Sequence, residues 1–232
     1  MTGVDRANGH KPAGISPLHH PALSNAPRPD PVKLGYDLNK ALSAVVPLQA
    51  RAPEDAFSSS YLGMERGGNA VLISEDGLLL TIGYLINECD LITVGTRIGG
   101  VAEAHIVAYD YETGFGLLRT YDDLGVDPLE LGYSSEVREG DTLTVGAHGG
   151  PAQAMAAKVS SVREFAGYWE YLIPGAIFTE PPHPIWSGAA LLDPEGKLVG
   201  IGSLFVQDAE DENADKQPGN MFVPADLLKP IF

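Results

Sequence analysis

The sequence predicts an all-β protein, because short apolar runs recur along it and turn residues separate them. The chain has 27 Gly and 18 Pro residues, and its middle part shows no sustained 3.6-residue apolar period that would indicate helices. Apolar residues make up 44% of the 232 positions, which is enough for one large domain or two small ones with a shared core. Runs at this spacing are typical of hairpins that close into barrels or sandwiches.

The N-terminal part is expected to change from a tail to a helix. Residues 1–30 are rich in Pro, Gly, Asn and His, a composition that buries too little apolar surface to offset its ordering entropy, so we predict a disordered tail. Leu34, Leu38 and Leu42 then recur at four-residue spacing, which predicts a short amphipathic helix. Pro47 should end this helix at the residue before it.

The expected strands fall into two sets. Similar turns, Ser-Glu-Asp-Gly at 74–77 and Asp-Pro-Glu-Gly at 193–196, each join two apolar runs, one in each half of the chain. A polar, turn-rich connector at 127–141 lies between the sets, so we place a boundary near residue 135, between units 31–135 and 136–232. The expected strands are 70–74, 78–82, 91–96, 102–109, 115–120, 142–147, 154–162, 168–173, 188–193 and 197–206.

Charge and cysteine content exclude several classes of partner and site. Acidic residues outnumber basic ones by 31 to 15, giving a net charge of −16, so we expect no nucleic-acid partner and no anionic membrane surface. Cys89 is the only cysteine, which excludes an internal disulfide and a multi-cysteine zinc site. We expect no metal and no cofactor.

The N-terminal residues also bear on location. They lack the apolar core of a secretory signal, and no stretch reaches the run of about 18 apolar residues that spans a bilayer. If Met1 is the true start, we expect a cytoplasmic protein; a start further upstream would allow a periplasmic one.

Five segments in order resemble one known family. They are GGNAVLISEDGLLLTIGYLI, YDYETGFGLLRT, EGDTLTVGAHGG, PIWSGAALLDPEGKLVGIGS and NMFVPADLLKPIF. The chain from about residue 43 to residue 232 resembles the protease domain of HtrA/DegP-type trypsin-like serine proteases. This resemblance implies two six-stranded β-barrels with the catalytic groups at their interface, followed by a C-terminal helix. Because the chain stops at Phe232, we expect no PDZ module.

The resemblance also locates the catalytic positions. The family pattern Thr-Asn-x-His-Val, which supplies the catalytic histidine, matches residues 81–85, and Tyr84 stands at the histidine. The pattern that supplies the acid matches residues 110–116 and places Gly114 at the aspartate. The nucleophile pattern Gly-Asn-Ser-Gly-Gly-Pro retains its serine as Ser187, while Ile185 and Trp186 replace the Gly and Asn of the loop whose N–H groups form the oxyanion hole.

These replacements remove two of the three catalytic roles. A serine hydroxyl needs a base that takes its proton during attack, and an imidazole suits this role because its unperturbed pKa is about 6.5. Tyrosine, with an unperturbed pKa of about 10, stays protonated, and Gly114 has no side chain to orient a base. We therefore interpret the chain as an inactive pseudoprotease that binds peptide or unfolded protein segments in the vestigial cleft, with Ser187 retained as a turn residue.

The sequence is also consistent with other hypotheses for the function. An active serine endopeptidase of the HtrA type would need a rearranged base, and His183 and His148 are the candidates, although both are more simply loop histidines. A structural stress protein for protein quality control would hold unfolded chains on an apolar patch. Relatives commonly form trimers through aromatic residues near the N-terminal segment, so a homo-oligomer stays an alternative.

Overall fold

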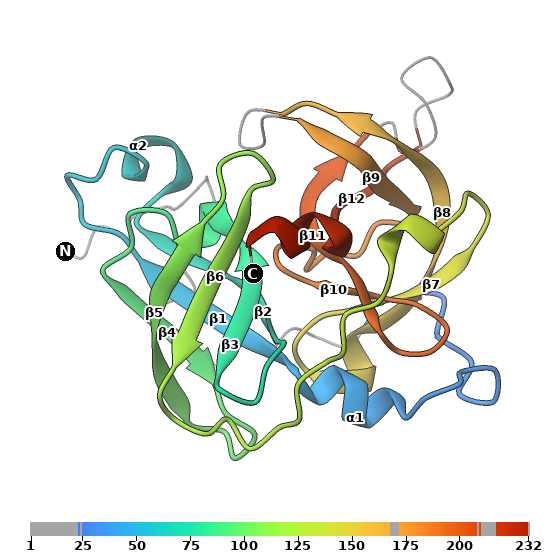
Figure 1. The fold of residues 1–232 in the computed structure, drawn as a ribbon, viewed down its shortest axis with the longest axis horizontal. Helices are drawn as coiled ribbons and strands as arrows, with labels where there is room; N and C mark the ends of the chain where they lie inside the picture. Colours follow the sequence, from blue (N-terminus) through green and yellow to red (C-terminus); the bar gives the residue numbers. More distant parts are fainter. Residues whose placement is uncertain (1–22, 24, 168–171, 208, 210–216, 232) are drawn as a thin grey trace.

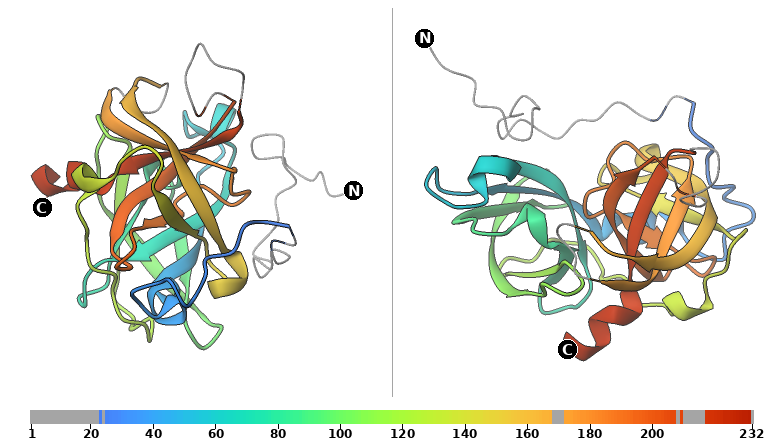
Figure 2. Two further views of the ribbon diagram at one scale, coloured as in Figure 1. Left: turned by 90° about the vertical axis from the view of Figure 1, so that its right-hand side faces the viewer. Right: turned by 90° about the horizontal axis from the view of Figure 1, so that it is seen from above.

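The computed structural model describes residues 23, 25–167, 172–207, 209 and 217–231, and its core is two closed barrels of six antiparallel strands each (Figure 1). This confirms the predicted all-β double barrel. The strand order is β1-β2-β3-β6-β5-β4 in the first barrel and β10-β11-β12-β9-β8-β7 in the second. The right-hand view of Figure 2 shows the two barrels side by side.

Each barrel takes its strands from one continuous half of the chain. The first barrel consists of β1 (Val45–Arg51), β2 (Glu65–Leu72), β3 (Leu78–Ile82), β4 (Leu91–Gly95), β5 (Val101–Tyr109) and β6 (Phe115–Thr120). The second consists of β7 (Thr142–Gly146), β8 (Ala154–Phe165), β9 (Ile173–Glu180), β10 (Ala190–Leu192), β11 (Leu198–Val206) and β12 (Gly219–Pro224). The predicted boundary near residue 135 falls inside the connection between β6 and β7.

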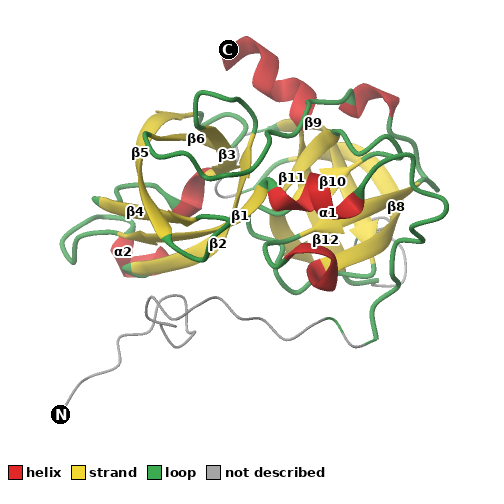
Figure 3. Cartoon of the chain, turned by 90° about the horizontal axis from the view of Figure 1, so that it is seen from below, coloured by secondary structure: helices red, strands yellow, loops and turns green. Residues whose placement is uncertain are grey.

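Short helices lie around the outside of the barrels (Figure 3). They are α1 (Leu38–Ser43), α2 (Ser59–Leu62) and the 3-10 helices η1 (Gly83–Leu85), η2 (Ser134–Glu136), η3 (Gly150–Gln153) and η4 (Ala225–Ile231). The expected C-terminal helix is η4, which is fixed to η2 because Asp226 accepts from the Ser135 N–H at 2.8 Å and donates its own N–H to Ser134 Oγ at 3.1 Å. No helix in the described parts of the chain has the length and apolarity to cross a membrane.

The N-terminal helix is shorter than predicted. It starts where the Asp37 carboxylate accepts from the N–H groups of Asn39 and Lys40, and it ends at Ser43, not at the residue before Pro47. The chain is already extended from Val45, because β1 pairs with β2 along its whole length. Pro47 has no N–H to donate, but it is tolerated in β1 because pairing with β4 begins only at Leu48, one residue later. The N–H that proline lacks would therefore stand at the end of the β1–β4 pairing.

Other strands differ from the prediction at their ends or were missed. The first two residues of β1, Val45 and Val46, were assigned to the helix, and the rest of β1 was given no strand. β12 was missed because Gly, Asn and Pro interrupt its apolar run, although all six of its residues are buried. β9 runs over Ile173–Glu180, whereas the prediction placed a strand at 168–173. Residues 168–171 lie outside the described part of the chain, as does most of the predicted tail 1–30.

The described end of the predicted tail is held against the second barrel. The Arg28 guanidinium donates to the carbonyl oxygens of Pro151, Ala152 and Ala154, and the Ala156 N–H donates to the Pro27 carbonyl at 2.8 Å. The bond from Ala156 to Pro27 lies on the edge of β8 that faces β9, ahead of Lys158, where the pairing of β8 with β9 begins. The segment therefore covers the end of the second barrel that η3 also borders.

The two barrels meet closely where the loop before β10 reaches β2. Gly188, in that loop, has a φ of 72°, the left-handed region that favours glycine. A Cβ atom there would overlap the carbonyl oxygen of Asn69 in β2 and press on Thr81 Oγ1 in β3. The backbone of the second barrel therefore lies directly against the first barrel, with no side chain between them.

We expect Gly188→Ala to destabilise the protein far more than Gly140→Ala. Gly140 has a similar φ of 90°, but a Cβ there meets nothing within 4 Å, so its substitution carries only the cost of the left-handed backbone, about 1–2 kcal/mol. Gly188→Ala adds overlap with backbone, and we expect a loss of about 3 kcal/mol or more in the free energy of unfolding. Urea unfolding of both variants measures the difference; equal losses would contradict this packing.

Candidate active site

A tyrosine and a serine from different barrels meet at the barrel interface. Tyr84 lies in η1, directly after β3 of the first barrel, and Ser187 lies in the loop before β10 of the second. The Tyr84 hydroxyl oxygen lies 2.8 Å from Ser187 Oγ and 2.7 Å from the carbonyl oxygen of Ser203 in β11. The structure thus brings together two of the residues that the resemblance assigned to catalytic positions.

The chemistry of these groups sets the direction of both hydrogen bonds. A phenol has one proton and a carbonyl oxygen can only accept, so the Tyr84 hydroxyl donates to Ser203. The contact with Ser187 is then made by the serine proton, which points at the phenolic oxygen. The result is a chain of hydrogen bonds from Ser187 through Tyr84 to the backbone of β11.

Gly114, the residue at the acid position, contributes backbone only. It has a φ of 77°, and its carbonyl oxygen accepts from the N–H of Gly83, the residue before Tyr84, at 2.6 Å. The carboxylate of Asp110 is engaged within its own turn, where it accepts from the N–H groups of Glu112 and Thr113 at 3.2 Å. This turn therefore supports the backbone of η1 through the Gly114 carbonyl.

The His183 ring contacts backbone groups of the second barrel. It is fully buried; its Nδ1 accepts from the Ile185 N–H at 3.0 Å and its Nε2 lies 3.1 Å from the Gln153 carbonyl. These partners require a neutral ring with the proton on Nε2. The main-chain N–H of His183 donates to Asn220 Oδ1 at 2.6 Å, so the histidine fixes the loop that leads to Ser187.

Ile185 and Trp186 shape the loop in different ways. The Ile185 N–H, which lies in the loop that the resemblance assigns to the oxyanion hole, donates to His183 Nδ1. The Trp186 ring packs against Phe205 of β11 with 5.9 Å between the ring centroids. Gly202 is required beside it, because a Cβ at that position would overlap the Trp186 carbonyl oxygen.

His148 belongs to a buried network centred on Asn69, which the sequence analysis did not identify. The Asn69 side chain is fully buried, and its Oδ1 accepts from His148 N at 2.8 Å and from His148 Nδ1 at 2.7 Å. Its Nδ2 donates to the carbonyl oxygens of Ser187 and Ile185 at 2.8 and 3.2 Å. One amide of the first barrel thereby holds two loops of the second; the polar Asn69 within the apolar run GGNAVLIS was the available signal.

Arg66 is a second residue that the sequence analysis missed. Its guanidinium is buried in β2 and donates to the carbonyl oxygens of Gly63, Tyr84 and Asn87 at 3.1, 3.0 and 2.7 Å. Burial lowers its pKa from the ordinary value. Because Arg66 donates a hydrogen bond to the carbonyl of Tyr84 itself, it fixes the backbone from which the phenol reaches Ser187.

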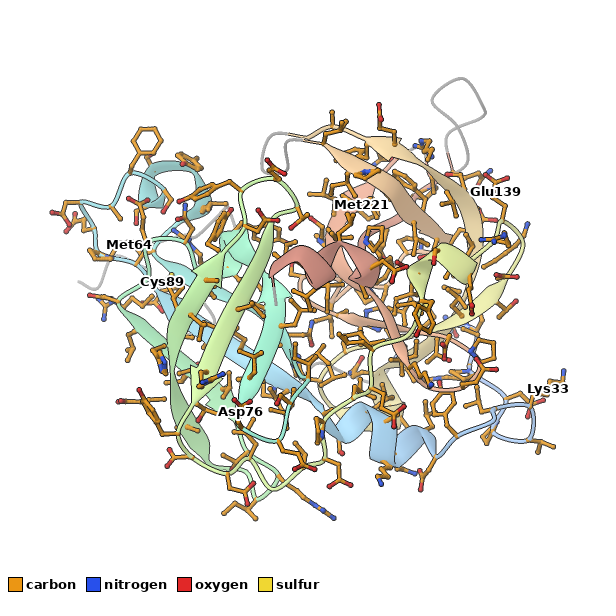
Figure 4. The ribbon with its side chains drawn as sticks, viewed as in Figure 1. Lys33, Met64, Asp76, Cys89, Glu139 and Met221 are labelled. Atoms are coloured by element: carbon orange, nitrogen blue, oxygen red, sulfur yellow. The ribbon has the colours of Figure 1, made fainter. Side chains whose placement is uncertain are left out.

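The remaining candidates lie elsewhere. His105 is on β5 and stacks on Tyr121 with 4.9 Å between ring centroids. Cys89, labelled in Figure 4, lies between η1 and β4 of the first barrel, and burial raises the pKa of its thiol to about 11. The Arg66 charge acts in the opposite direction but does not offset the burial. A thiol with this pKa is protonated and weakly reactive at neutral pH.

Comparisons with known proteins match this geometry. Residues 68–201 match the model of the trypsin-like peptidase domain. The chain is 25% identical over 231 residues to the serine endoprotease DegS of Haemophilus influenzae and 24% identical over 213 residues to the serine protease Do-like HtrA of Bacillus subtilis. These alignments cover 95% and 84% of this chain, but 66% and 46% of the two relatives, so the chain spans less than two thirds of their length.

Solved structures show the same fold. The HtrA-type protease AlgW with tripeptide superposes with a TM-score of 0.65 and 23% identity, over 84% of this chain and 60% of the other. The same protease with decapeptide gives a TM-score of 0.62 and 22% identity, over 84% and 66% of the two chains. The double barrel described above is therefore of the HtrA type.

Removing the buried amide should test the network around Asn69. In Asn69→Ala, two carbonyl oxygens and two nitrogen donors lose their partner inside the protein, and we expect a loss of about 2–4 kcal/mol in the free energy of unfolding. Asn39→Ala makes the same change at an exposed helix position and should stay within about 0.5 kcal/mol. A small loss in Asn69→Ala, measured by urea unfolding, would show that the network does not hold the barrels together.

The raised pKa of Cys89 predicts slow thiol chemistry in the native protein. At pH 8 about one thiol in a thousand is ionised when the pKa is about 11, so labelling by Ellman's reagent should be much slower than in the protein unfolded in guanidinium chloride. The native rate should rise as the pH increases toward 11. A native rate equal to the unfolded one at pH 8 would contradict the burial of this thiol.

Proposed function

The chain belongs to the trypsin-like peptidase family, and from this membership and the geometry of its site we propose that it is a pseudoprotease. In this proposal the protein does not hydrolyse peptides but binds extended segments of peptides or unfolded proteins at the barrel interface. The observation that carries the proposal is the Tyr84 phenol, which lies 2.8 Å from Ser187 Oγ at the place of the family's base.

A neutral phenol does not act as the base that Ser187 needs. General base catalysis requires a group near the serine that accepts a proton at the working pH. Tyr84 already uses its own proton on the Ser203 carbonyl, so it could receive the Ser187 proton only by becoming a cationic oxygen acid, which water would deprotonate at once. The Ser187 hydroxyl is thus hydrogen-bonded but not activated.

The surrounding loop supports the same proposal. Preorganised N–H groups that face the developing oxyanion supply much of the transition-state stabilisation in acyl transfer, and loss of one donor lowers kcat about 10²–10³-fold. The Ile185 N–H donates to His183, whose own ring is held by Gln153. An active endopeptidase that uses His183 would have to break both contacts, and one that uses His148 would have to break its contact with the Asn69 amide.

Peptide binding needs none of the lost groups. An extended segment can add to an exposed strand edge through main-chain hydrogen bonds alone, with side-chain pockets supplying the preference. The net charge of −16 favours uncharged or basic segments over acidic ones. AlgW, which shares the fold, has been solved with a tripeptide and with a decapeptide, so this fold is compatible with peptide ligands in a relative.

Labelling with a fluorophosphonate probe tests the loss of activation. We expect no labelling of the purified protein under conditions that label an active HtrA-type protease, and the same absence in Ser187→Ala. Cooperative thermal unfolding of both forms would show that the result refers to folded protein. Labelling that disappears in Ser187→Ala would overturn the proposal and direct attention to His148 and His183.

Restoring the triad residues should not restore hydrolysis. We expect Tyr84→His combined with Gly114→Asp to stay below about a hundredth of the peptidase activity of an active HtrA-type protease, because the Ile185 N–H still faces His183. Casein hydrolysis by the double variant, with a further Ser187→Ala version as the blank, measures this. Activity close to that of the active protease would mean that the two substitutions alone account for the lost function.

A further inference from the structure

One strand edge beside Ser187 has no neighbouring strand within the described part of the chain. β11 pairs with β12 on one side along Gly200–Val206, but on the other side β10 pairs with it no further than Ile201. The Gly202 N–H and carbonyl close this second side, because they bond to Ala189 and Gly188 at 2.8 Å. From Ser203 onward, no strand of the described chain pairs with this edge.

The Tyr84 hydroxyl occupies the first acceptor of this edge. The Ser203 carbonyl directly follows Gly202 and lies 2.7 Å from the phenolic oxygen, which donates to it. The register of β11 against β12 shifts between Gly202 and Leu204, so Ser203 is the extra residue of a β-bulge and its carbonyl can face the same side as Gly202. Leu204 pairs again with Met221 of β12, so the next residue, Phe205, directs its N–H and carbonyl toward the open edge. A segment that adds to this edge would therefore bond first to Ser203 and then to Phe205.

We propose that Tyr84 is an internal lock on this peptide-binding edge, and that an extended peptide binds by displacing the phenol from the Ser203 carbonyl with one of its own N–H groups. This inference rests on the proposed function and deepens it by naming the contact that limits binding. The ligand is an extended, uncharged or basic segment recognised mainly through its main chain. The residue at the base position thus weakens the site in which it stands.

The main chain of Tyr84 is fixed, whereas its side chain can rotate. The backbone of Tyr84 is fixed by Arg66 through its carbonyl at 3.0 Å and by the neighbouring Gly83 N–H through Gly114 at 2.6 Å. The phenol itself is half-buried and is held at its tip by the contacts with Ser187 and Ser203. Opening therefore requires a side-chain rotation that breaks these two hydrogen bonds while η1 stays in place.

The variant that tests the lock is Tyr84→Phe. It keeps the ring and removes only the hydroxyl, so the hydrogen bond from the phenol to the Ser203 carbonyl is lost. The matched control is Tyr121→Phe, the same change on a side chain that is 89% exposed and that contacts His105 through its ring. Thermal unfolding of each variant establishes that the compared proteins are folded.

The probes are synthetic decapeptides. Random decapeptides displayed on phage are selected separately against the wild type and against Tyr84→Phe, and the best ones are synthesised with a fluorescein label. Fluorescence anisotropy then gives their affinities for all three proteins. We expect Tyr84→Phe to bind about three to ten times more tightly than the wild type, as the loss of a competing hydrogen bond implies, and Tyr121→Phe to match the wild type.

Peptides with single N-methylated amides identify the contact itself. Methylation of the amide that meets Ser203 should abolish the difference between the wild type and Tyr84→Phe, whereas methylation at positions that face solvent should preserve it. A gain that survives methylation at every position would mean that the hydroxyl acts through packing, and this would overturn the lock.

The two proposals can fail separately. Equal affinity of the wild type and Tyr84→Phe for a bound decapeptide would overturn the lock while the proposed peptide-binding function stands. If folded wild type and folded Tyr84→Phe both fail to bind any selected decapeptide, the proposed function is wrong, and the lock is wrong because the opened edge takes no peptide.

Discussion

The buried amide of Asn69 is the interaction on which the rest of the site depends. It stands in β2 of the first barrel, where it is fully shielded from water, yet its side chain bonds to Ser187, Ile185 and His148 in loops of the second barrel. A buried amide without partners is costly, so the loops that satisfy it are fixed at this point. The Asn69 backbone adds two further contacts, an N–H that donates to the Ser187 carbonyl at 2.9 Å and a carbonyl that accepts from Thr81 Oγ1 at 2.7 Å.

This constraint separates the position of Ser187 from its reactivity. The backbone of the serine is held by Asn69, and the preceding loop is held by His183, Gln153 and Asn220. None of these contacts needs a base or an acid at residues 84 and 114. The loop can therefore keep one conformation with Tyr84 and Gly114 in place, and the serine hydroxyl is satisfied by the phenol that faces it.

The sequence was sufficient for the architecture but not for the polar contacts. Apolar runs, hairpin turns and the order of five segments predicted two barrels, because burial of alternate or continuous apolar residues leaves a direct pattern in the chain. The end of α1 was wrong because Val45 and Val46 fit a buried strand as well as a helix, and pairing with β2 decided between them. Tyr84 and Ser187 were placed by motif register, which the chain order alone can supply.

The roles of Asn69, Arg66 and His183 could not be predicted in this way, since their partners are main-chain groups. A carbonyl or N–H group is present at every residue, so the sequence does not show which one a buried side chain will meet. His183 illustrates the difference: as a loop histidine four residues before Ser187 it was a candidate base, whereas in the fold its ring holds the Ile185 N–H. The imidazole that could have accepted a proton thereby holds the backbone N–H of Ile185, in the loop that an oxyanion hole would have used.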